Sequence, residues 1–77
     1  MVNKKTISQL IYIASQGSTT WYAAQQGIFF DGMDDVCAKL KAAGHQLQQR
    51  SDDWVLVDSA AWVSPHGVVR PHKTSNL

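Results

Sequence analysis

The sequence predicts one small α+β domain in which three short helices are followed by a two-stranded β-hairpin. The chain has 77 residues, 44% of them hydrophobic, which is enough for one core and too few for two domains. Its first half places apolar residues at helical spacing, and a later segment combines β-branched and aromatic residues beside a polar turn. We expect the domain to span residues 1–64, with a flexible basic tail over residues 65–77.

The first helix is predicted over residues 7–16. Thr6 and Gln9 form a capping-box pair, whose side chains satisfy free backbone N–H groups at the start of a helix. The apolar residues that follow share one helical face: Ile7, Leu10, Ile11 and Ala14. Gly17 follows as the residue that ends the helix.

A second, shorter helix is predicted over residues 21–26. Residues 18–20 are Ser or Thr and offer polar caps, and Gly27 ends the helix. The apolar stretch 28–30 is expected to be irregular. Because neighbouring side chains of an extended segment point to opposite sides, we expect either Phe29 or Phe30 to lie at or near the surface.

The third helix is the clearest, and it opens at Asp31 or Gly32. Its apolar residues recur at helical spacing: Met33, Val36, Cys37, Leu40 and Ala43. Asp34 and Asp35 lie in the first turn, and Lys39 and Lys41 lie near the end, so the charges match the helix dipole at both ends. Gly44 then ends the helix.

A β-hairpin is predicted from residues 45–50 and 54–58, joined by the polar turn 51–53. Residues 59–64 are expected to supply one further packed element, and Val68 and Val69 a brief pairing. The predicted tail contains basic residues and histidines but no acid: His66, Arg70, His72 and Lys73.

The residues that mark enzymes and metal sites do not assemble into a recognisable motif. Cys37, the single cysteine, lies on the buried stripe of the third helix, so it fails as a nucleophile for the nearby His45. There is no phosphate-binding glycine loop, paired glutamate or nucleophile elbow. We therefore expect no enzyme, no metal and no cofactor. With no apolar segment long enough to target or span a membrane, a cytoplasmic protein without a membrane partner is expected.

Two stretches of the chain carry a resemblance to a known family. Residues 17–28, GSTTWYAAQQGI, are similar to a second helix and turn in which a small residue (Ala23) allows close packing and a glycine (Gly27) makes the turn. Residues 36–47, VCAKLKAAGHQL, look like a third helix that runs into a first wing strand. Over residues 6–58 the chain thus resembles the winged helix-turn-helix family, in particular its small phage and mobile-element members.

The resemblance implies a small transcriptional regulator that binds duplex DNA through the third helix and the wing. Carried onto this sequence, six residues would contact DNA: Lys39, Lys41, Gln48, Arg50, Arg70 and Lys73. A homodimer is expected, because one such module covers little DNA alone.

The distribution of charge leaves a second function open. Seven Lys and Arg residues face six acids, all of them Asp, and the net charge of +1 argues against binding a polyanion by charge alone. The acids gather at the front of the third helix and at the hairpin turn. The alternative is therefore a protein-binding module, such as a phage-encoded inhibitor, adaptor or DNA mimic. Its surface would combine acids with an apolar anchor: Phe29, Phe30, Asp31, Asp34 and Asp35.

Overall fold

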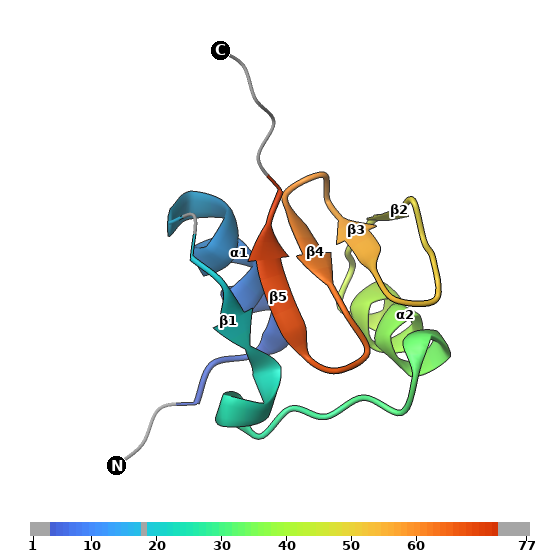
Figure 1. Ribbon diagram of the computed structural model, residues 1–77, viewed down its shortest axis with the longest axis horizontal. Helices are drawn as coiled ribbons and strands as arrows, with labels where there is room; N and C mark the ends of the chain where they lie inside the picture. The colour runs from blue at the N-terminus through green and yellow to red at the C-terminus, as the bar shows by residue number, and fades with distance from the viewer. Residues whose placement is uncertain (1–3, 18, 73–77) are drawn as a thin grey trace.

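The computed structural model describes residues 4–17 and 19–72. In chain order, these residues form two α-helices, one short 3₁₀ helix and five strands (Figure 1): α1 (Ile7–Gly17), β1 (Trp21–Tyr22), η1 (Ala23–Gln26), α2 (Met33–Ala42), β2 (Leu47–Gln48), β3 (Val55–Val57), β4 (Ala61–Val63) and β5 (Val68–Pro71).

The strands form one antiparallel sheet in the order β1-β5-β4-β3-β2. β2 to β5 follow one another as a meander, and β1 joins the sheet at the far edge by pairing with β5 (Figure 1). The first strand of the chain is therefore held by the last one, with Trp21 opposite Val69 and Tyr22 opposite Val68.

The prediction of three helices followed by a two-stranded hairpin is wrong, although the α+β class partly fits. The predicted second helix, residues 21–26, divides into β1 and η1. Trp21 and Tyr22 are aromatic residues that favour a strand, and they pair with β5, a pairing that no local sequence pattern predicts. Only the stop is as expected, because Gly27 ends η1 with a φ of 77°, in the left-handed region that favours glycine.

The segment from residue 65, for which the sequence predicts a flexible tail, contributes the strand β5. This strand lies between β1 and β4, with Arg70 opposite Trp62 and Pro71 opposite Ala61. The His72 backbone N–H donates to the Ala60 carbonyl at 3.0 Å. The prediction of a tail therefore fails for β5, which is a strand with neighbours on both sides, whereas the expected pairing of Val68 and Val69 is confirmed. Lys73 and the residues after it lie outside the described residues.

Three other expectations are confirmed. At the start of α1, the Gln9 N–H donates to Thr6 Oγ1 at 3.1 Å and the Thr6 N–H donates to Gln9 Oε1 at 2.7 Å, as a capping box requires. α2 carries its acids in the first turn and its lysines in the last. β2 and β3 form the expected hairpin, with Leu47 opposite Val57.

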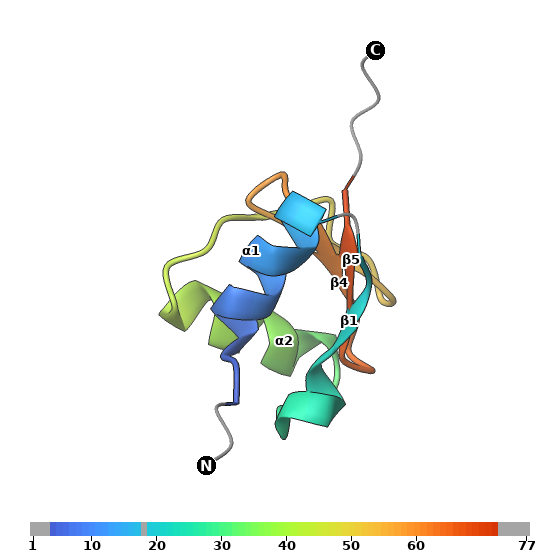
Figure 2. The ribbon, with the colours of Figure 1, turned by 90° about the vertical axis from the view of Figure 1, so that its left-hand side faces the viewer.

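The core lies between the helices and one face of the sheet. α1 and α2 both cover this face, and none of the described helices covers the opposite face of the sheet (Figure 2). The largest fully buried side chains come from both layers: Leu10, Val36, Leu40, Val55, Val57, Val63 and Val69. Cys37 is buried among them, as predicted. Within the described ranges, neither α-helix has the length and apolarity needed to cross a membrane.

Candidate binding surfaces

The face of the sheet that the helices leave uncovered, called here the open face, carries a row of side chains set by the strand register. Gln48 pairs with Leu56, Leu56 with Trp62, and Trp62 with Arg70, so these four residues cross the sheet from β2 to β5. The adjacent row of Val55, Val63 and Val69 belongs to the core. Because side chains alternate along a strand, the first row must face away from the helices.

A pocket of about 420 Å³ lies on this face, lined by Ser51, Trp54, Trp62, Arg70 and Pro71. We call it the tryptophan pocket. The Arg70 guanidinium lies 5.6 Å from the centre of the Trp54 ring, within the range of a cation–π contact. Trp62 contacts His72 edge to face, with 5.8 Å between ring centres. An aromatic wall with one convergent cation is typical of a binding site.

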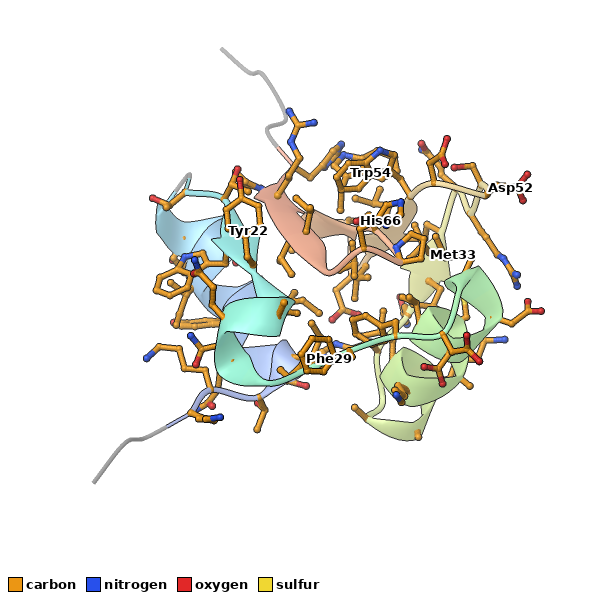
Figure 3. All side chains as sticks on the ribbon, turned by 60° about the horizontal axis from the view of Figure 1, so that its bottom comes forward. Tyr22, Phe29, Met33, Asp52, Trp54 and His66 are labelled. Carbon is orange, nitrogen blue, oxygen red and sulfur yellow. The ribbon has the colours of Figure 1, made fainter. Side chains whose placement is uncertain are left out.

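The loop before β3 holds Trp54 in place. The Ser51 N–H donates to the Trp54 carbonyl at 2.8 Å, and the Trp54 N–H donates back to Ser51 Oγ at 3.1 Å. Figure 3 shows Trp54 on the side of the sheet away from Met33, the first residue of α2. The wall of the pocket is therefore fixed by backbone contacts and not only by packing.

No sequence pattern predicts the pocket, because its walls come from three separated segments. The sequence pattern predicts a strand at Trp54, a packed element of no specified type around Trp62, and a tail that includes Arg70. Period-two alternation around Trp62 and Arg70 is the only local signal that both face one side of a sheet, and it spans three or four residues in each strand.

The surface formed by α2 and the β2–β3 hairpin, called here the α2–hairpin surface, holds Lys39, Lys41 and Arg50 of the residues predicted to contact DNA, whereas Gln48 belongs to the open-face row. Lys39 is engaged three times within the protein. Its Nζ pairs with Asp35 Oδ2 at 2.9 Å, donates to the Phe29 carbonyl at 3.1 Å, and lies 5.4 Å from the centre of the Phe30 ring. Lys39 therefore fastens the loop before α2 to the helix.

Gln48 and Arg50 of the hairpin also have partners within the protein. The Gln48 amide group donates to Ser59 Oγ at 2.9 Å and accepts from the Ser59 N–H at 2.8 Å. Arg50 forms an ion pair with Asp34 of α2, which raises the pKa of Arg50. Among the six predicted DNA contacts, Lys41 lies exposed on the same surface, Arg70 lines the tryptophan pocket, and Lys73 lies outside the described residues.

The residues predicted for the protein-binding alternative lie together at the start of α2. Phe29 is 69% exposed on the connection from η1 to α2 (Figure 3), whereas Phe30 packs against the core. The expectation that one of the two lies at the surface is confirmed. Asp31 and Asp34 are exposed and Asp35 is half-buried. The hydrogen bond from Lys39, and a second from the Asp31 backbone N–H, lower the pKa of Asp35.

Comparison of the chain with models of protein families, with curated proteins and with solved structures finds no match to any of the three.

Proposed function

We propose that the protein is a binding module that recognises another protein through the tryptophan pocket. The observation that carries the proposal is the position of Arg70 over Trp54 and opposite Trp62, in a pocket on the face of the sheet that no helix covers. Trp, Tyr and Arg are the residue types that contribute most to binding energy at protein interfaces. Tyr22, 49% exposed on the neighbouring edge strand, extends the same aromatic surface.

The chemistry of the pocket indicates the partner. Its walls favour an apolar or aromatic side chain that packs between the indole rings, and the Arg70 guanidinium favours a carboxylate beside that side chain. A net charge of +1 gives little general attraction for a polyanion, which makes a protein segment the better-supported partner.

Nucleic acid is the second proposal, because aromatic rings and arginine also stack on unpaired bases. Duplex binding through the α2–hairpin surface has less support. Lys39, Gln48 and Arg50 would each have to give up a contact within the protein before reaching a phosphate or a base. The homodimer and the cytoplasmic location remain predictions from the sequence.

Selection from a displayed library of random peptides on the immobilised protein tests the first proposal. We expect selected peptides to carry an acidic residue next to an aromatic or apolar one. Their affinity should fall about tenfold or more for Trp62→Ala and for Arg70→Ala, as truncation of a central interface residue does. Lys41→Ala, an exposed cation on the α2–hairpin surface, is the matched control and should leave the affinity unchanged.

The two proposals differ in their response to salt. If the pocket takes nucleic acid, a short single strand of mixed sequence should bind and lose affinity steeply as the salt concentration rises. Peptides that bind equally well to Arg70→Ala and Trp62→Ala would overturn the first proposal. Duplex binding that depends on Lys39 and Lys41 would restore the α2–hairpin surface as the site.

A further inference from the structure

Three polar side chains from distant parts of the chain form a continuous hydrogen-bonded series on the helix side of the sheet. Ser8 Oγ lies 2.7 Å from His45 Nε2, and His45 Nδ1 lies 2.6 Å from Asp58 Oδ2. Ser8 comes from the first turn of α1, His45 from the connection between α2 and β2, and Asp58 from the turn between β3 and β4. No sequence motif relates the three residues, and the only partner that sequence proximity suggests for His45 is Cys37.

The direction of the hydrogen bonds follows from the state of Asp58. Partial burial opposes its charged form, but hydrogen bonds from the Gln46 N–H, at 2.8 Å, and from His45 outweigh it and lower the pKa of Asp58. The ionised carboxylate only accepts, so His45 Nδ1 carries the proton. In a neutral imidazole Nε2 is then an acceptor, and the Ser8 hydroxyl donates to it.

The backbone fixes this arrangement. Asp58 and Ser59 both have a φ of 55°, a left-handed conformation that is costly for residues other than glycine. The Asp58 N–H donates to the Gln46 carbonyl at 2.8 Å, and the His45 N–H donates to the Leu40 carbonyl at 3.0 Å. Backbone contacts thus aim both the imidazole and the carboxylate, while the side chain of His45 is only 14% exposed.

A hollow of about 330 Å³ lies directly beside Ser8, lined by Ser8, Gln9, Tyr12 and Ile13. It is mostly apolar, and Tyr12 is 66% exposed. Ser8 also lies in the first turn of α1, where the positive end of the helix dipole favours a developing negative charge.

From these observations we propose that Ser8 is an activated nucleophile, with His45 as its general base and Asp58 as the positioning residue, and that it reacts with esters of small apolar acyl groups. Ser8 Oγ attacks the ester carbonyl while its proton passes to His45 Nε2. The carbon–oxygen bond to the alcohol then breaks, and the alcohol leaves with that proton. Water, deprotonated by His45, releases the acid and restores Ser8.

Covalent labelling of the full chain with phenylmethylsulfonyl fluoride tests this proposal. Ser8 Oγ displaces fluoride from sulfur, and the adduct is located by peptide mass spectrometry. Ser15 provides a comparison within the same helix, because its hydroxyl donates to the Tyr12 carbonyl at 2.7 Å instead of to an imidazole nitrogen. We expect one adduct, on Ser8, with Ser15 unmodified in the same sample.

Variants separate activation from folding. His45→Ala should slow labelling of Ser8 about 100-fold, the usual contribution of a general base, and added imidazole should restore part of the rate. Asp58→Asn should slow it too, and Ser15→Ala should not. Release of p-nitrophenol from p-nitrophenyl butyrate should be lost in Ser8→Ala.

Circular dichroism verifies the fold of each variant. The ratio of Ser8 to Ser15 labelling is measured within the wild type, so it tests the proposal even if a variant does not fold. Equal labelling of the two serines, or Ser8 labelling that His45→Ala leaves unchanged, would overturn the proposal.

Discussion

The α2–hairpin surface and the open face of the sheet both carry basic residues, but they use them differently. On the α2–hairpin surface, Lys39 and Arg50 are paired with Asp35 and Asp34. On the open face, the Arg70 guanidinium faces an aromatic ring in an open pocket. The charged side chains of the α2–hairpin surface pair with one another and hold its elements together. The tryptophan pocket instead presents Arg70 and two indole rings to a partner.

The comparison shows that the type of a residue does not by itself identify a binding surface. Four of the predicted DNA contacts lie on the third helix and the hairpin: Lys39, Lys41, Gln48 and Arg50. The structure gives three of them, Lys39, Gln48 and Arg50, a partner within the protein. Arg70 differs from Lys39 and Arg50 in that its neighbour is an aromatic ring, and no ion pair joins it to another described residue.

The largest expected effect concerns the centre of the open face. Leu56 is only 4% exposed although no helix covers it, because it lies between Gln48 and Trp62 in the side-chain row. Leu56→Ala should lower the free energy of unfolding by about 2–3 kcal/mol, as removal of a buried leucine does. Urea unfolding measures this, with Leu56→Met as the volume-conserving control. A loss below about 1 kcal/mol would mean that the open face has no packed layer of its own.

The next effect concerns the contact between the hairpin and the β3–β4 turn. Gln48→Ala removes both hydrogen bonds with Ser59, and we expect a loss of about 1–2 kcal/mol. Gln25→Ala, at an exposed position in η1, is the matched control and should change the stability little. If both variants unfold at the same urea concentration, the contact with Ser59 does not stabilise the protein. Gln48 would then be available to contact DNA.

A smaller difference should separate the two lysines of α2. Lys39→Met removes the contacts with Asp35 and the Phe29 carbonyl, and should cost about 0.5 kcal/mol, in the range of exposed ion pairs. Lys41→Met should be close to neutral. Thermal unfolding of the two variants in parallel decides the point, and equal melting temperatures would show that Lys39 does not hold the loop.

The smallest effect is visible only in acid. Because folding lowers the pKa of Asp58, its charged form stabilises the folded state above the unfolded pKa of about 3.9, and this contribution is lost as the pH falls through the folded pKa. The wild type should therefore lose stability below about pH 4 more steeply than Asp58→Asn. The pKa of Asp35 is also lowered, but Asp35 is present in both the wild type and Asp58→Asn, so its contribution to the pH dependence cancels. Identical pH profiles would contradict the assignment.

The features that the sequence predicted correctly are those made by contacts between near neighbours. The capping box of Thr6 and Gln9, the apolar stripe of α2 and the exposure of one of two adjacent phenylalanines each depend on residues that are adjacent or three to four apart. The hairpin of β2 and β3 is local as well. The prediction of a helix over residues 21–26 is wrong because pairing with β5, a strand far away in the sequence, outweighs the local start and stop signals of a helix.

Local patterns in the sequence were enough to predict α1, α2 and the pairing of β2 with β3, and they predicted the α+β class in part. The tertiary structure alone decided that β1 pairs with β5, that Trp54, Trp62 and Arg70 share a pocket, and that Ser8 meets His45 and Asp58. The physical reason is the range of the interactions. A helix closes its hydrogen bonds within four residues, whereas a sheet edge, a pocket and a chain of side-chain hydrogen bonds need partners that no local pattern specifies.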